Sequence, residues 1–315
     1  MQPDPQTTSQ PAPQPTSQPA PQAAPQAAPQ AVKIGLGLPL QDPVLLFEWA
    51  RRADAGPFST LGLADRVVFD NPEPLVTLAA LAGATSRVRL QTEVLLAPHH
   101  VPALLAKQTA TLDLLSGGRF TLGLGVGGRE DDFLAAGIDP RRRGRLLDER
   151  MAVLRRLWAG EPFGDGVGPV GPAPVTPGGP EVLFGGFAPA ALDRVGRFGD
   201  GFLGAGVPPE AMAGLFQDVE KSWQRHGRDG RPRLVAQANA VLGSAETVEQ
   251  ARRNIRAYYE SSGRADRMEE GLLTTPEAIR AAVAGFTAIG ADEVMLYCWS
   301  PEVDQVDRFA ELLFR

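Results

Sequence analysis

The stretch RVRLQTEVLLAPHHVPALLAKQTATLDLLSGGRFTLGLG, residues 87–125, carries the pattern that decides the fold. Apolar and polar residues alternate over 87–96, which predicts a strand. Residues 101–118 begin with a proline near their start and end on a glycine pair, as a helix does. The short apolar run 119–125 then predicts a second strand. Two strands joined by a helix form a parallel βαβ unit.

The same alternation of strand and helix continues on both sides of this unit. Further strands are predicted at residues 32–38, 59–65, 181–186, 200–206, 233–243 and 292–298. Helices are predicted at residues 42–55, 73–86, 145–158, 189–198, 209–226, 246–262, 276–289 and 301–314. Eight strands, each followed by a helix, predict an α/β fold of the (β/α)₈ TIM-barrel type with insertions. An open doubly wound sheet is the alternative, because it alternates in the same way.

The beginning of the chain has a different composition from the rest. Residues 1–31 are rich in Pro and Gln, and the heptapeptide TSQPAPQ occurs at Thr8 and again at Thr16. We expect a disordered tail, because large apolar side chains that could offset the ordering entropy are missing there. The segment lacks the basic start and apolar core of a secretory signal. Residues 32–315 are predicted to form the barrel domain.

Charge and composition exclude several classes of protein. The formal net charge of -6 argues against nucleic-acid binding, which usually needs a basic face. Apolar runs are too short to span a bilayer. The lone Cys298 excludes an intrachain disulfide and multi-cysteine metal sites, and the pair His99-His100 has no carboxylate at ligand spacing. We therefore expect a cytoplasmic protein without a metal ion.

In a barrel, the active site lies at the carboxyl ends of the strands. Asp65 and Arg66 follow the second predicted strand and are the candidate catalytic residues, with a surface ion pair as the alternative. Glu93 interrupts the apolar third strand. It points either to solvent or into the mouth of the barrel, where burial would raise its pKa.

Two glycine-rich segments follow later strands. GLGVGG, residues 123–128, matches the dinucleotide fingerprint G-x-G-x-x-G, but a charged stretch with a helix breaker follows it. We interpret these glycines as positions where backbone or ligand approaches closely. In GGFAPAALDRVGRFGDG, residues 185–201, a helix begins shortly after two glycines. The free N–H groups at such a helix start can bind an anion such as a phosphate, and a plain strand-to-helix turn is the alternative. Ala188 and Pro189 occupy the positions where the hydroxyl of a Ser or Thr often assists in binding the anion.

Five segments together resemble the bacterial-luciferase-like superfamily of flavin-dependent oxidoreductases. They are IGLGLP (34–39), ADRVVFDNPEPLVTLAALAGATSRVRL (64–90), LLAKQTATLDLLSGGRFTLGLGVGGREDDFLAAGI (104–138), RGRLLDERMAVLRRLW (143–158) and FGGFAPAALDRVGRFGDGF (184–202). The resemblance implies a luciferase-like TIM barrel, commonly a homodimer. It also implies binding of reduced FMN, or of the deazaflavin F420, at the mouth of the barrel.

The function implied by this resemblance is a flavin-dependent monooxygenase. Such an enzyme uses reduced FMN, supplied by a separate flavin reductase, and O₂ to oxygenate a small organic substrate. The alternatives are an F420-dependent enzyme that transfers hydride, and a flavin-binding barrel without turnover. The segments 160–180 and 262–275 are expected to select the substrate.

The resemblance also assigns positions to the cofactor. The flavin ring would lie against Thr92, Glu93 and Val94, with a non-prolyl cis peptide bond between Glu93 and Val94. Its phosphate would bind at Gly185, Gly186 and Phe187, with Gly125 nearby. Asp65 matches an aspartate common in the F420 branch. The chain departs from the family by having Arg66 in place of a histidine, Val126 in place of an arginine, and Glu93 in place of a small residue.

Overall fold

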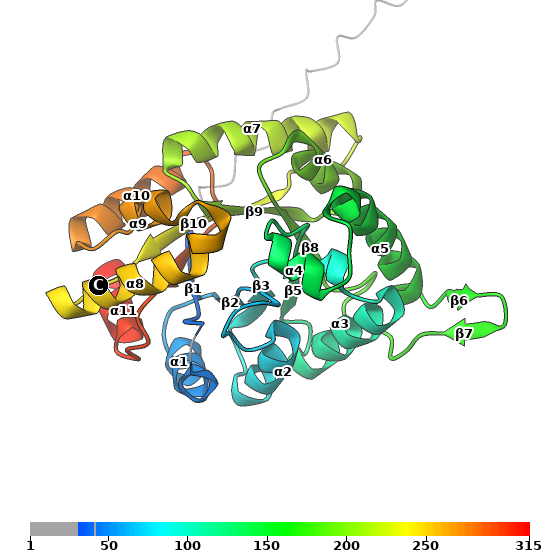
Figure 1. Ribbon diagram of the computed structural model, residues 1–315, viewed down its shortest axis with the longest axis horizontal. Coiled ribbons are helices and arrows are strands. Elements are labelled where there is room, and N and C mark those ends of the chain that lie inside the picture. Colours follow the sequence, from blue (N-terminus) through cyan, green and yellow to red (C-terminus); the bar gives the residue numbers. More distant parts are fainter. Residues whose placement is uncertain (1–30, 41) are drawn as a thin grey trace, which may run out of the picture. The chain divides into compact units, whose positions relative to one another are not determined.

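Eight parallel strands close into a barrel in the computed structural model, which describes residues 31–40 and 42–315 (Figure 1). The strand segments are β1 (Lys33–Gly37), β2 (Thr60–Leu63), β3 (Arg89–Thr92), β4 (Leu95–Leu96), β5 (Phe120–Gly125), β8 (Glu181–Gly185), β9 (Gly201–Gly206), β10 (Arg233–Ala240) and β11 (Glu293–Cys298). They follow the order β3-β2-β1-β11-β10-β9-β8-β5-β4, and pairing of β3 with β5 closes the ring. The predicted TIM barrel is confirmed, and the open sheet is excluded. The predicted tail lies outside the described residues, apart from Ala31.

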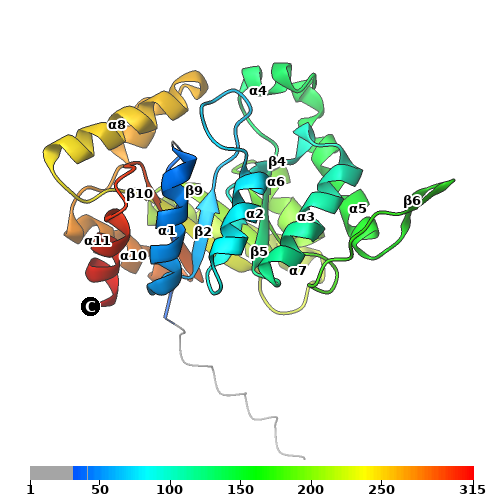
Figure 2. The ribbon, with the colours of Figure 1, turned by 90° about the horizontal axis from the view of Figure 1, so that it is seen from below.

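Helices surround this barrel in Figures 1 and 2. They are α1 (Pro43–Ala55), α2 (Pro74–Ala84), α3 (Pro102–Ser116), α4 (Glu130–Ala135), α5 (Arg143–Trp158), α6 (Pro189–Phe198), α7 (Pro209–Arg225), α8 (Ala245–Tyr259), α9 (Ala265–Glu270), α10 (Pro276–Ala288) and α11 (Gln305–Phe314). Several begin at a proline, which needs no hydrogen-bond acceptor in the first turn. None of the helices in the described ranges is both long and apolar enough to cross a membrane.

Small and large side chains alternate around the inside of the barrel. A Cβ atom at Gly35 would collide with Met295, one at Gly37 with the ring of Tyr297, and one at Gly62 with the Glu93 carboxyl group. The repeated G-x-G pattern of these strands therefore marks inward positions that side chains from other strands fill. Such complementary packing fills the centre of a TIM barrel.

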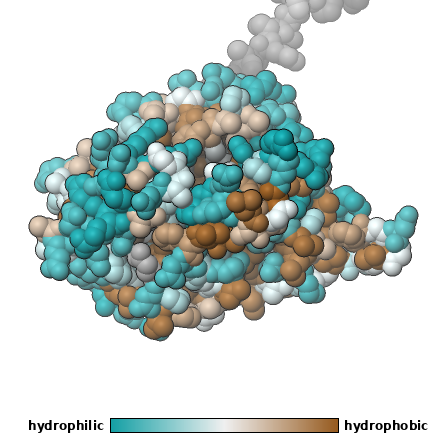
Figure 3. All heavy atoms as spheres, in the orientation of Figure 1, coloured by the Kyte–Doolittle hydropathy of each residue, from teal (hydrophilic) through white to brown (hydrophobic). Residues whose placement is uncertain are grey.

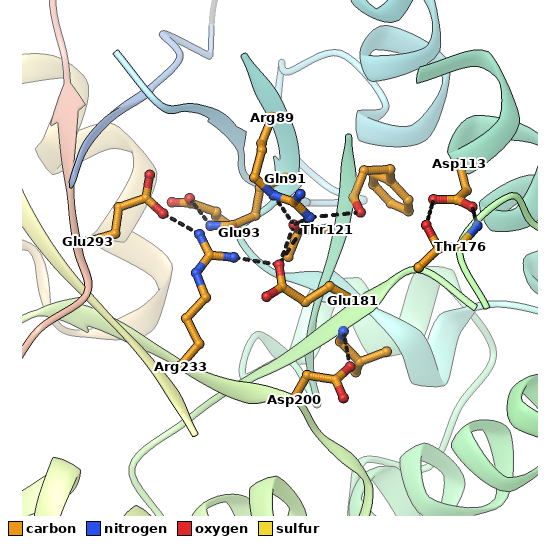
Figure 4. Close-up of polar contacts among 12 residues, drawn as sticks. Arg89, Gln91, Glu93, Asp113, Thr121, Thr176, Glu181, Asp200, Arg233 and Glu293 are labelled. Carbon is orange, nitrogen blue, oxygen red and sulfur yellow. Dashed lines mark hydrogen bonds and ion pairs between the residues drawn. The ribbon is translucent and has the colours of Figure 1, made fainter. Parts of the chain in front are cut away.

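The amino-terminal end of the barrel contains a layer of ion pairs (Figure 4). Arg233 of β10 lies between Glu181 of β8 and Glu293 of β11 and pairs with both. Arg89 donates to Glu181 at 3.1 Å, and Thr121 donates to the same carboxylate at 2.8 Å. Because Glu293 is completely buried, this charge requires the arginine beside it.

Two local predictions need correction. The strand expected over 87–96 is split into β3 and β4, and the peptide bond between Glu93 and Val94 at the break is cis, as the resemblance implies. The charged stretch after GLGVGG was expected to lack a helix, but Glu130–Ala135 forms the short helix α4. In Figure 2, α4 and α8 lie at the same end of the barrel, beyond the carboxyl ends of its strands.

Candidate functional site

A cavity of about 490 Å³ opens at the carboxyl ends of the barrel strands. It has the size and mixed lining of a small-molecule site. Its walls come from the loops after β2 and β5, from β4, from the β8–α6 turn, and from the end of α8. The lining residues used below are Asp65, Arg66, Glu93, Val94, Gly125, Gly128, Arg129, Gly185, Gly186, Phe187, Ala188, Tyr258, Tyr259, Arg264, Tyr297 and Trp299.

The structure brings together all but one of the candidate catalytic and cofactor-binding residues. Asp65, Arg66, Glu93, Val94, Gly125, Gly185, Gly186 and Phe187 all line this cavity. Thr92 is the exception and needs correction: its side chain is buried, and its Oγ1 donates to the Gly123 carbonyl at 2.7 Å. Thr92 therefore joins β3 to β5 instead of facing the cavity.

Asp65 and Arg66 are neighbours in sequence but bind different partners. Asp65 accepts a hydrogen bond from the Leu96 N–H at 2.8 Å, so it fixes the loop after β2 to β4. Arg66 donates to Asp132 at 3.4 Å, and its guanidinium carbon lies 4.7 Å from the centroid of the Tyr258 ring. The alternative of a surface ion pair between Asp65 and Arg66 is therefore wrong.

Glu93 points into the barrel mouth. Its Oε1 accepts a hydrogen bond from Gln91 at 2.6 Å, and its Oε2 is buried without a hydrogen-bond partner in the described structure. The pKa of Glu93 is raised to about 8, chiefly by burial and also by the nearby Glu293 charge, against the opposing effects of Gln91, Tyr297 and Arg233. The side chain is therefore mostly neutral at pH 7.

The turn between β8 and α6 offers unpaired backbone donors. Within the described residues, the N–H groups of Gly186, Phe187 and Ala188 donate no hydrogen bond, and all three residues line the cavity. Gly186 adopts a φ of 142°, a conformation that favours glycine. Free amides before a helix start form an anion site. The side chain of Arg129, which also lines the cavity, adds a positive charge, although Asp131 pairs with it.

Sequence reasoning missed the aromatic wall of the cavity. Tyr258 and Tyr259 close α8, and Trp299 directly follows β11. Their ring centroids lie 4.9 Å apart for the two tyrosines and 5.4 Å apart for Tyr258 and Trp299. Burial raises the pKa of Tyr259 well above its ordinary value, so this phenol stays neutral. The available signal was the position of Trp299 immediately after the last strand, where barrel enzymes place functional residues.

Helix α4 supplies two further residues that were missed. Arg129, at its N-terminus, lines the cavity, and the buried Asp132 accepts hydrogen bonds from the N–H groups of Val67 and Val68 at 3.0 and 2.8 Å. Asp132 thereby joins α4 to the loop that carries Arg66. The sequence showed this segment only as a charged stretch with a helix breaker, because pairing between distant loops leaves no periodic signal.

The three histidines do not line the cavity, and His100 Nε2 lies 4.0 Å from Asp65 Oδ2. The ring of His99 lies edge-on to Phe133 at 5.1 Å, and burial lowers its pKa. His226 contacts Asp193 at 3.0 Å. Over residues 31–40 and 42–315, no group of three or more His, Cys, Asp or Glu side chains is arranged to hold a metal ion.

The two segments expected to select the substrate differ in position. Ser262 and Arg264 line the cavity, and the segment 262–275 contains α9. The segment 160–180 does not line the cavity. It forms a hairpin of β6 (Pro162–Gly164) and β7 (Val167–Pro169), which projects away from the barrel in Figures 1 and 2. The chain after β7 is bound to α3, where the Asp113 carboxylate accepts a hydrogen bond from the Thr176 N–H at 2.8 Å.

Curated relatives match about half of this chain. A protein of Mycobacterium tuberculosis without an assigned function is 35% identical over 173 residues, which cover 52% of this chain and 60% of that protein. The 4-hydroxyprotoasukamycin monooxygenase of Streptomyces nodosus subsp. asukaensis is 33% identical over 171 residues, covering 49% of this chain and 46% of that enzyme. The matched part thus spans less than two thirds of these relatives.

Solved structures share the fold over most of the chain. The monooxygenase RslO1 from Streptomyces bottropensis has a TM-score of 0.75 at 24% identity, covering 90% of this chain and 99% of that one. An F420-dependent secondary alcohol dehydrogenase in complex with an F420-acetone adduct also has a TM-score of 0.75, at 18% identity, covering 90% and 98%. The sequence profile of the luciferase-like monooxygenases matches residues 16–299. The chain belongs to the luciferase-like monooxygenase family.

Proposed function

We propose that the chain is an oxidoreductase that binds reduced FMN in the cavity and uses O₂ to oxygenate a small organic substrate. The observation that carries this proposal is the row of unpaired N–H groups at Gly186, Phe187 and Ala188, which lies on the rim of an otherwise largely apolar cavity. A phosphate needs such donors. Reduced FMN, when bound, supplies the electrons that activate O₂.

The residues present fit this cofactor. The three amides and Arg129 would hold its phosphate, and Val94, whose methyl groups lie against Gly125 and Gly185, would support the flat ring system. A Cβ atom at Gly128 would meet no other atom within 4 Å, so the backbone there leaves room for a ligand. Neutral Glu93 would lie near the ring without repelling a negative charge on it.

The aromatic wall has a separate task in this proposal. Tyr258, Tyr259 and Trp299 would pack on the substrate and keep water away from the reacting atoms. Trp299 is fixed for this role, because its Nε1 donates to the Asn239 Oδ1 at 2.9 Å. The matching monooxygenase relative supports the same class of reaction.

Hydride transfer with F420 is the second candidate. It is favoured by Asp65, which lines the cavity and matches an aspartate of that branch, and by the similar fold of the F420-dependent alcohol dehydrogenase. In both cases we propose that a separate enzyme reduces the cofactor.

GLGVGG lies at the cavity and leads into the six-residue helix α4, which is too short for the helix of a dinucleotide-binding unit.

The deciding experiment is an anaerobic titration of the full chain with reduced FMN, reduced F420 and reduced riboflavin. FMN is expected to bind more tightly than riboflavin, which lacks the phosphate, and O₂ consumption should follow when air and substrate are admitted. Binding of F420 alone would assign hydride transfer. FMN binding without O₂ consumption across a substrate panel would indicate a flavin-binding barrel without turnover. Equal affinities for FMN and riboflavin would contradict the role given to the three amides.

A further inference from the structure

Arg66 differs from the other buried arginines because most of its donors are unused. Only 12% of its side chain is exposed, and among residues 31–40 and 42–315 its guanidinium makes a single hydrogen bond, of 3.4 Å, to Asp132. Its Nε is buried without a partner among the described residues. A guanidinium has five N–H donors, and leaving them unpaired in a buried place is costly.

Arg119 and Arg194, which do not line the cavity, show how this chain satisfies an arginine when the role is structural. Arg119 donates five hydrogen bonds, to carbonyl groups of α2, α3 and the loop between α2 and β3 and to a threonine hydroxyl. Arg194 donates to the Asp148 carboxylate and to the Gly144 carbonyl. Neither pattern applies to Arg66. The Nη2 group of Arg66, unlike its buried Nε, is accessible and makes no hydrogen bond in the described structure, so it is available to a ligand in the cavity that Arg66 lines.

The neighbouring carboxylates cannot take up these donors without breaking other bonds. One oxygen of Asp132 already accepts the Val67 and Val68 amides, which fixes its orientation. Asp65 is turned toward β4, where it accepts the Leu96 amide. The two aspartates therefore hold the loop in place while leaving the guanidinium exposed to the cavity on its remaining side.

The surroundings of Arg66 define the shape of the ligand. The guanidinium lies over the ring of Tyr258, which in turn contacts Tyr259 and Trp299. A flat apolar group can pack on these rings while an attached anion receives two parallel hydrogen bonds from the guanidinium. Arg264, also on the cavity wall, adds to the positive potential.

We propose that the organic substrate is a flat, aromatic or similarly unsaturated acid whose carboxylate or phenolate is bound by Arg66 beside the aromatic wall. This inference rests on the proposed function, because it names the substrate class of the same cavity. Arg66 acts as a specificity residue that holds the acid in place. The phosphate of the cofactor is assigned to different donors, at Gly186, Phe187 and Ala188.

The test uses benzoate and its neutral analogue benzamide as probes, with binding to the full chain followed by ligand-observed NMR without cofactor. Benzoate is expected to bind about tenfold more tightly than benzamide, as a charge-assisted hydrogen bond pair implies. Arg66→Gln should reduce this ratio to about one without changing the affinity for benzamide, and Arg66→Lys should keep part of it. Arg253→Gln, which removes an exposed charge of α8, is the matched control and should behave as the native chain.

Several results would overturn the inference. They are equal affinities for the two probes, no binding of benzoate at millimolar concentration, or an unchanged ratio in Arg66→Gln. Displacement of benzoate by FMN, together with weaker FMN binding in Arg66→Gln, would assign this arginine to the cofactor instead. The chain could also prefer benzoate through Arg66 and yet bind no flavin. That result would support the inference and contradict the proposed function.

Discussion

The carboxyl group of Glu93 occupies the space beside Gly62 in which any other residue would place its Cβ atom. Gly62 lies on β2, and Glu93 directly follows the neighbouring strand β3, so the absence of a side chain at residue 62 is what allows an acid to enter the barrel mouth. We expect Gly62→Ala to destabilise the fold by about 1–3 kcal/mol, as overpacking does. Urea denaturation measures the loss. The loss of stability should be smaller in a Glu93→Ala background. An equal loss there would contradict the close contact between residue 62 and the Glu93 carboxyl group.

Glu93 should make stability depend on pH. The folded state keeps this carboxyl neutral up to about pH 8, whereas in the unfolded chain it ionises near pH 4.3. Between these values the folded state binds more protons, so stability falls as pH rises, by at most about 1.4 kcal/mol per pH unit. Glu93→Gln should remove this slope and be more stable than the native chain above pH 8.

Denaturation of both chains between pH 5 and pH 9 checks this prediction, with Glu249→Gln on the surface of α8 as the control. The control should keep the slope of the native chain. A native slope that persists in Glu93→Gln would show that this carboxyl is ionised in the folded state. An infrared band of a protonated carboxylic acid near neutral pH, absent from Glu93→Gln, is an independent sign.

Arg233 should be essential for stability. Replacing it with Met leaves Glu181 and the fully buried Glu293 without their shared counterion. We expect a loss of about 3–5 kcal/mol in the free energy of unfolding, measured by urea denaturation. The triple variant Arg233→Met, Glu181→Gln, Glu293→Gln should recover much of that loss. Arg253→Met, which removes a weak surface pair, should change stability by less than about 1 kcal/mol.

Asp132 should control the order of the loop that carries Arg66. Asp132→Ala removes the acceptor of the Val67 and Val68 amides and the only carboxylate that pairs with Arg66 in the described structure. We expect faster hydrogen exchange over residues 64–73 and weaker binding of benzoate, by about tenfold. Unchanged exchange in that loop would show that α4 is not needed to order it.

We propose that the chain forms a homodimer through α2 and α3. Val76, Leu104 and Leu115 are 68%, 54% and 60% exposed on these adjacent helices, and hydrophobic atoms gather over the region of α3 and α4 in Figure 3. Exposed apolar side chains at this density favour an interface. Leu104→Glu should shift the mass measured by light scattering toward the monomer. Val44→Glu, on α1, should not, and a monomeric native chain would contradict the proposal.

The sequence predicted the barrel well because burial on both faces makes each strand a short apolar run between helix signals. It also located the β8–α6 turn and Glu93, since a glycine pair and a lone acid stand out in such runs. Tyr258 and Asp132 could not be found in the same way. Their roles depend on contacts with Arg66 from another loop, and pairing between distant segments leaves no periodic trace. The cis peptide bond between Glu93 and Val94 was predicted from the family resemblance and not from any pattern, and the break of the strand at these residues was not predicted.

The ion pairs of Arg233 fill the amino-terminal end of the barrel, so we expect ligands to enter the cavity only from the carboxyl ends of the strands. A ligand that reaches Glu93 from that side would leave by the same way. Two ligands that share this passage cannot exchange independently, because the outer one blocks the inner one. Binding should therefore be sequential, with the deeper molecule first in and last out.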